Sequence, residues 1–87
     1  MERLTIRTET GYSLPPERLE AAAARLGALE TLYEELSARH SAASGELEEL
    51  RAAGRGKSVR FRERLAQKLT DAAILDALSG PMAAGEG

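Results

Sequence analysis

The sequence predicts an all-α protein in which a long helix, a glycine turn and a shorter helix form a hairpin. Apolar residues recur at steps of three and four from Leu19 to Leu50, the spacing of a helix that packs against other helices. The glycines of Gly54-Arg55-Gly56-Lys57 interrupt this pattern, and a second apolar stripe follows. Because 87 residues without cysteine bury only a thin core, we expect several copies to assemble into an oligomeric helical bundle.

A short strand or arm is expected before the helices. Residues 3–8 alternate apolar and polar side chains, which is a strand pattern, and Glu9-Thr10-Gly11 is typical of a turn. A single strand cannot satisfy its own backbone hydrogen bonds. Its partner is expected to be a symmetry mate or another extended segment such as Ser58–Phe61, and without either it would remain a loose arm.

The helical hairpin is predicted over residues 15–79. It begins at Leu14-Pro15-Pro16-Glu17, since proline is tolerated in the first turn of a helix. Ser58 suits the N-cap of the second helix, and Gly80-Pro81 is expected to end that helix. We thus expect a strand or arm at residues 1–14, followed by helix 1 at residues 15–53 and the turn at 54–58. Helix 2 is expected at residues 59–79 and a disordered tail at 80–87.

Folding the hairpin about Arg55–Gly56 lays helix 2 against only the second half of helix 1. The stripe that helix 2 presents consists of Phe61, Leu65, Leu69 and Ala72. In this register Leu69 lies opposite Ala43. The first half of helix 1 then keeps an unpartnered apolar stripe, which forfeits on the order of a few kcal/mol of burial. We therefore expect a homodimer or higher oligomer, with interface residues Leu19, Leu26, Leu29, Tyr33, Ile74, Leu75 and Leu78.

The titratable residues form no catalytic or metal-binding motif. One histidine and no cysteine leave no candidate metal site or cofactor site, and no nucleophile–base pair indicates an enzyme. His40 lies on the apolar seam of helix 1, where we expect a structural role with a carboxylate or backbone partner. No apolar run is long enough to span a bilayer, and no hydrophobic signal core is present, so a cytoplasmic protein is expected.

The best candidate site is the basic turn between the two helices. Seven bases and one acid lie between Arg51 and Lys68, whereas acids dominate between Glu17 and Glu49. Glycines and a helix N-terminus next to bases suit a phosphate group. The Gly-Lys-Ser triplet resembles the end of a P-loop, but no strand precedes it and the first glycine of that motif is missing. The candidate ligand-binding residues are Arg55, Lys57, Ser58, Arg60 and Arg62, with Tyr12, Tyr33 or Phe61 stacking on a base.

The alternative is that the basic turn is only structural. In the folded hairpin Arg62 and Arg64 lie near Glu46, Glu48 and Glu49, so the two charged runs would pair and fix the register. Nucleic-acid binding is disfavoured, because the net charge is −2 and only three residues are aromatic.

Several short segments add a resemblance. Met1–Thr8 with Gly11–Leu14, Leu32–Leu36, Gly56–Arg62 and Leu65–Thr70 resemble pieces of small phage and prophage accessory proteins of Gram-positive gut bacteria, a family without an established activity. The resemblance implies an anti-defence protein in the cytoplasm of an infected or lysogenic host. Such a protein would be non-enzymatic and would sequester a phosphate-bearing ligand, such as a nucleotide or cyclic-nucleotide immune messenger. The alternatives are a coiled-coil protein that binds a host or phage protein, and a small nucleic-acid-binding protein.

Overall fold

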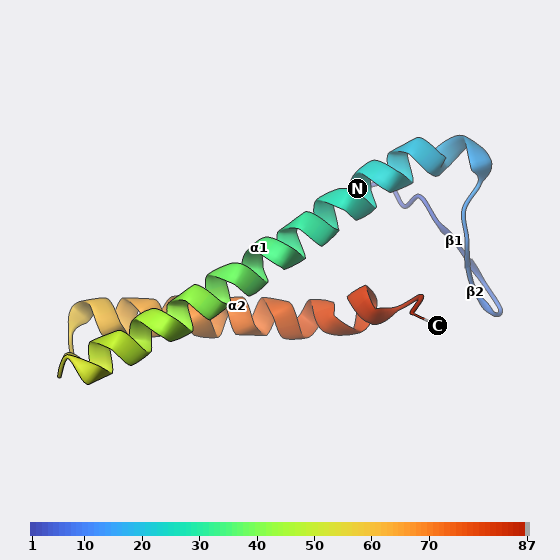
Figure 1. Cartoon of the computed structure of the whole chain (residues 1–87). Helices are drawn as coiled ribbons and strands as arrows, with labels where there is room; N and C mark the ends of the chain where they lie inside the picture. Colours follow the sequence, from blue (N-terminus) through green and yellow to red (C-terminus); the bar gives the residue numbers. More distant parts are fainter. Residues whose placement is uncertain (87) are drawn as a thin grey trace. The chain divides into compact units, whose positions relative to one another are not determined.

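The computed structural model describes residues 1–86 and divides into two units, residues 1–31 and the residues from Leu32 on. It confirms a mostly helical chain with one long and one shorter helix and a short N-terminal extended part (Figure 1). The N-terminal part consists of strand β1 (Ile6–Thr8), strand β2 (Gly11–Ser13) and the 3-10 helix η1 (Pro16–Arg18). The two α-helices that follow are α1 (Leu19–Ala52) and α2 (Val59–Ala83). Helix α1 contributes its first part to unit 1 and the remainder to unit 2.

In unit 1, β1 and β2 form an antiparallel hairpin, with Ile6 opposite Ser13 and Thr8 opposite Gly11. The first strand therefore pairs with another extended segment of the chain, as one of the predicted arrangements had it, but this segment is Gly11–Ser13 and not Ser58–Phe61. The loop contains only Glu9 and Thr10. Gly11 follows at φ +148°, a backbone conformation that residues with a Cβ rarely adopt, so glycine lets the chain reverse here.

The predicted start of helix 1 is displaced. Pro15 is extended, with ψ 136°, because the ring of Pro16 disfavours the helical region for the residue before it. The first turn is the 3-10 helix η1, closed by the Arg18 N–H donating to the Pro15 carbonyl at 2.9 Å, and α1 begins at Leu19.

In unit 2, the turn between the helices satisfies the helix ends on both sides. Gly54 has φ +74°, its N–H donates to the Arg51 carbonyl, and the Arg55 N–H donates to the Leu50 carbonyl at 2.7 Å. This is the Schellman arrangement, which satisfies carbonyls left over at the end of α1. Ser58 then caps α2, since its Oγ accepts from the Phe61 N–H at 3.1 Å, as predicted.

The predicted end of helix 2 at residue 79 is wrong. Helix α2 continues through Gly80-Pro81 to Ala83. The clash that keeps a residue before proline out of the helical region involves its Cβ, and Gly80 has none. The predicted tail therefore loses residues 80–83 to the helix. Its last residue, Gly87, lies outside the described residues.

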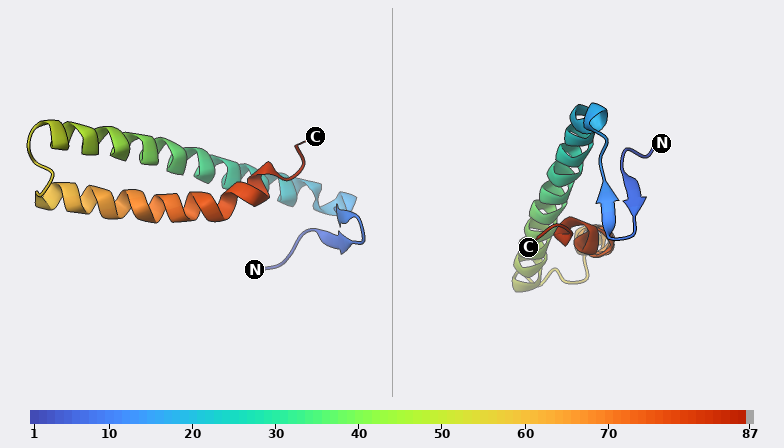
Figure 2. Two further views of the ribbon diagram at one scale, coloured as in Figure 1. Left: turned by 90° about the horizontal axis from the view of Figure 1, so that it is seen from below. Right: turned by 90° about the vertical axis from the view of Figure 1, so that its right-hand side faces the viewer.

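The core of unit 2 is thin and lies between two antiparallel helices. The second part of α1 and helix α2 run side by side from the turn that joins them (Figure 2). The buried apolar residues are Leu36, Ala43, Leu47 and Phe61, each 4–6% exposed. The predicted seam of helix 1 is therefore buried in this part of the chain. The most buried side chain of all is the carboxylate of Asp71, in a residue 1% exposed.

Helix α2 is rotated relative to the prediction. Leu69 was expected against Ala43, but it is 61% exposed, while Lys68 and Asp71 occupy the side that faces α1. The reason is the ion pair that Asp71 forms with Arg39 of α1, because burying Asp71 turns Leu69 outward. The lengthwise register agrees with the prediction to within one helical turn, because Leu69 opposite Ala43 puts residue 71 two residues from Arg39.

We expect Ser58→Ala to lower the free energy of unfolding by about 1 kcal/mol, because the substitution leaves the Phe61 N–H without its cap. Chemical denaturation measures this change. The matched control is Ser41→Ala, an exposed serine within α1, for which stability should stay level or rise by a few tenths of a kcal/mol. Equal losses in both variants would contradict the capping role.

Candidate functional site

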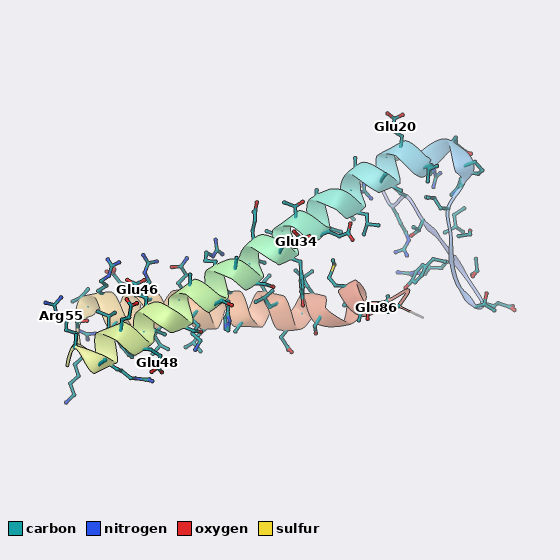
Figure 3. The ribbon with its side chains drawn as sticks, viewed as in Figure 1. Glu20, Glu34, Glu46, Glu48, Arg55 and Glu86 are labelled. Atoms are coloured by element: carbon teal, nitrogen blue, oxygen red, sulfur yellow. The ribbon has the colours of Figure 1, made fainter. Side chains whose placement is uncertain are left out.

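The side chains of the basic turn are largely exposed. Arg55 lies at the end of the hairpin, close to the last turns of α1 that carry Glu46 and Glu48 (Figure 3). Arg55, Lys57 and Arg62 are exposed and form no ion pair within the described residues. The Ser58 hydroxyl is already used, since it caps α2 and donates to the Arg55 carbonyl at 2.8 Å. Three of the predicted ligand-binding bases are thus accessible, while the serine has a structural role.

Two other bases of the run pair with the acidic part of α1. Arg60 and Arg64 contact the two carboxylate oxygens of Glu46 at 2.5 and 2.7 Å. Glu46 is partly buried, with its side chain 23% exposed, so this pairing is better shielded than a fully exposed ion pair. The predicted pairing of the two charged runs is confirmed for Arg64 but is wrong for Arg62, which forms no ion pair among residues 1–86. Arg60 is exposed as well, but it already shares the Glu46 carboxylate with Arg64.

The predicted aromatic platforms are not all accessible. Phe61 is 6% exposed, and the Arg51 guanidinium lies 5.3 Å from its ring centre, a cation–π contact. Phe61 is therefore a core residue and not a surface on which a base stacks. Tyr33 is half-buried in unit 2. Tyr12 is 69% exposed in unit 1, where Arg3 lies 5.5 Å from its ring centre.

A bidentate polar contact that was not predicted from the sequence joins Arg39 and Asp71. The Arg39 Nε and NH2 groups donate to the two Asp71 carboxylate oxygens at 2.8 and 2.7 Å, which is the bidentate geometry that arginine favours. A signal was available, because the predicted register with Leu69 opposite Ala43 puts residue 71 opposite residue 41, within one helical turn of Arg39.

The charges around Asp71 set its protonation. The hydrogen bonds from Arg39 hold the pKa of the Asp71 carboxyl below its ordinary value, although burial acts in the opposite direction. The charges of Arg39 and of His40 lower this pKa further. His40 is half-buried on the seam, and a carboxylate or backbone partner for its side chain stays a prediction.

Unit 1 has no buried residue, although it is rich in leucine. All residues from 1 to 31 are half-buried or exposed. The unit 1 stripe, formed by Leu19, Ala22, Leu26 and Leu29, includes leucines that are 64%, 54% and 40% exposed. The contacts that hold the unit are polar, since Arg18 and Arg25 donate to the carbonyls of Leu4 and Glu2 at 3.1 and 2.9 Å.

The other predicted interface residues lie in unit 2. Ile74 is 39% exposed, whereas Tyr33, Leu75 and Leu78 are half-buried. The accessible apolar surface is therefore concentrated in unit 1, with a smaller share on α2.

Within residues 1–86 no cluster of three potential metal ligands occurs, and no helix of this part of the chain is long and apolar enough to cross a membrane. In comparisons with known proteins, no family model, no curated protein and no solved structure matches the chain.

The lowered pKa of Asp71 predicts acid sensitivity. Because the folded protein binds this proton more weakly than the unfolded chain does, the contribution of Asp71 is fully present above its ordinary pKa of about 3.9. It is lost as the pH falls through the lower, folded-state value. Asp71→Asn should reduce stability near neutral pH and flatten its decline in acid, as measured by chemical denaturation between about pH 7 and pH 2.

The control for this experiment is Glu49→Gln, which neutralises an exposed acid of α1 that has no ion pair within residues 1–86. It should retain the acid sensitivity of the wild type. An Asp71→Asn variant whose stability falls as steeply as that of the wild type would show that other groups cause the transition.

Proposed function

We propose that the protein is a non-enzymatic helical interaction protein that works as a homo-oligomer, with the unit 1 stripe as its main binding surface. The observation that supports this proposal is the contrast between the units. All five buried residues of the described chain lie in unit 2, whereas unit 1 exposes its large apolar side chains. The leucines of unit 1 would become buried only when a partner covers them.

The size of the exposed stripe supports a partner that covers it fully. Burying one leucine side chain contributes about 1.5–3 kcal/mol, and an isolated two-stranded hairpin is marginally stable at best in water. Association that buries Leu19, Leu26 and Leu29 in the first part of α1 would therefore contribute the burial free energy of three leucine side chains. These terms are comparable with the whole stability of a small domain.

The spacing of the stripe supports a helix as the partner. The steps of three and four residues that run from Leu19 to Leu29 continue into the seam that α2 covers in unit 2. A second copy supplies a helix with the same spacing, and it is present wherever the protein is made. The resemblance to phage accessory proteins favours a role in which the assembled helices bind a host or phage protein.

We expect Leu26→Glu to lower the number of copies per particle, because the substitution places a charge in the centre of the stripe that association would bury. Light scattering after size-exclusion chromatography measures the mass. The matched control is Ala24→Glu, which adds the same charge to an exposed position on the opposite face of the same helix turn. A particle mass unaffected by Leu26→Glu would refute the proposed interface.

A phosphate-bearing ligand at the basic turn is the second candidate function. The specific observation in its favour is that Arg55, Lys57 and Arg62 are exposed and without ion pairs in the described part of the chain. Because Glu46 already pairs with Arg60 and Arg64, these three bases can neutralise an anion without first breaking an internal contact.

A thermal-shift screen with nucleotides and cyclic di- and trinucleotides tests this second function. A ligand at 100 times its dissociation constant should stabilise the fold by about 2.7 kcal/mol. Replacing Arg55 and Lys57 together with alanine should abolish the shift, whereas Arg7→Ala, an exposed base of unit 1, should leave it unchanged. A shift that persists in the double variant would place the ligand elsewhere.

A further inference from the structure

Helix α2 carries a second exposed face that its packing against α1 does not use. Residues at steps of four and three follow the outward side of the helix, and all of them are exposed. We name this set the α2 seam; it consists of Arg62, Ala66, Leu69, Ala73, Asp76 and Gly80. Leu69 is its only large apolar side chain, and it is 61% exposed. The spacing is that of a helix that packs against another helix.

The charges of the α2 seam are arranged symmetrically about Leu69. Arg62 lies seven residues before Leu69 and Asp76 lies seven residues after it. Neither side chain forms an ion pair among residues 1–86, whereas the neighbouring bases Arg60 and Arg64 both pair with Glu46. The base and the acid lie at equal distances from the exposed leucine. An antiparallel copy of α2 would therefore present its acid to the base and its base to the acid.

We propose that the α2 seam binds the α2 seam of a second copy in antiparallel orientation, with a two-fold axis at Leu69. Arg62 of each copy then lies opposite Asp76 of the other copy, which gives two equivalent ion pairs at the ends of the contact. The two Leu69 side chains meet in the middle. A two-fold contact of this type closes after two copies, because the same patch is used on both sides.

The small residues of the seam fit this arrangement. With the axis at Leu69, Ala66 lies at the level of Ala72 of the other copy, next to Ala73, and Val59 lies at the level of Ser79, next to Gly80. Alanine and glycine at the contact allow the two helix axes to approach to the lower part of the usual range of about 8–10 Å. The exposed side chain of Val59, 63% accessible in the single chain, then meets only the small residues Ser79 and Gly80 of the other copy.

The charges of Arg62 and Asp76 favour a second copy of the chain as the partner of the α2 seam, and they favour the antiparallel orientation. In a parallel pair Arg62 would lie against Arg62, and Asp76 against Asp76, which is destabilising. A foreign helix would have to reproduce an acid, a central apolar residue and a base at the same seven-residue spacing. The inward face of α2 still packs on α1, so this contact is separate from the unit 1 stripe and does not depend on the function proposed above.

Because the chain has no cysteine, the full-length protein allows a direct test by disulfide formation. In Leu69→Cys the two introduced thiols face each other at the axis, and mild oxidation should give a covalent dimer on a non-reducing gel. The matched control is Val59→Cys, at a similarly exposed position of the same helix. Its two thiols would lie roughly 30 Å apart, at 1.5 Å per residue, which is far beyond the reach of a disulfide.

Charge reversal tests the orientation, again in the Leu69→Cys protein. Arg62→Asp alone and Asp76→Arg alone should each lose the covalent dimer, whereas the combination of both substitutions in one chain should restore it. A mixture of the two single variants should give covalent dimers between unlike chains, since every facing pair is then attractive. The proposal is overturned if Leu69→Cys is cross-linked no faster than Val59→Cys, or if the charge reversals have no effect. Adding Leu26→Glu should leave the cross-link intact, which separates this contact from the unit 1 stripe.

Discussion

The ion pair between Arg39 and Asp71 is the constraint on which the helical hairpin depends. A carboxylate cannot be buried without a partner, and Arg39 supplies one through two hydrogen bonds. This requirement fixes both the lengthwise position of α2 on α1 and the rotation of α2 about its own axis. Four apolar side chains alone make a thin core, and such a core specifies register weakly. The pairing of Arg60 and Arg64 with Glu46 repeats the same restraint nearer the turn.

Much of the fold could be predicted because it depends on local patterns. The three-and-four spacing indicated the long helix, and Gly54 and Ser58 indicated where the two helices end and begin. The rotation of α2 could not be predicted from hydropathy. The apolar Leu69 fits a buried stripe and the charged Lys68 does not, so hydropathy favours the wrong face. Only the pairing of Asp71 with Arg39 decides between the two faces. Similarly, the continuation of α2 through Pro81 depends on the absence of a Cβ at Gly80, a steric detail that composition does not convey.

The candidate site was predicted in outline but not in its members. Counting charges along the chain located the basic turn, yet the availability of each base depends on which carboxylate it reaches in the folded hairpin. Two of the bases, Arg60 and Arg64, pair with Glu46. Phe61 is buried in the core, and the Ser58 hydroxyl caps α2. What remains accessible is the apolar stripe of unit 1, the outward seam of α2 and three bases without ion pairs among residues 1–86, of which Arg62 also belongs to the seam. All three surfaces suit recognition of a partner, and none of them carries a nucleophile with an adjacent base.

The Gly54 turn closes the hairpin without setting its register, because the ion pairs between the helices do that. A Cβ at Gly56 would meet only the Arg51 side chain, at 3.8 Å, and Arg55 and Lys57 point into solvent. A peptide or a whole domain inserted between Arg55 and Lys57 would therefore lengthen a loop whose ends stay where the helices hold them. The entropic cost of that lengthening is only about 0.6 kcal/mol for each doubling of the loop. This turn is thus the natural position for grafting a fluorescent or affinity module onto the chain.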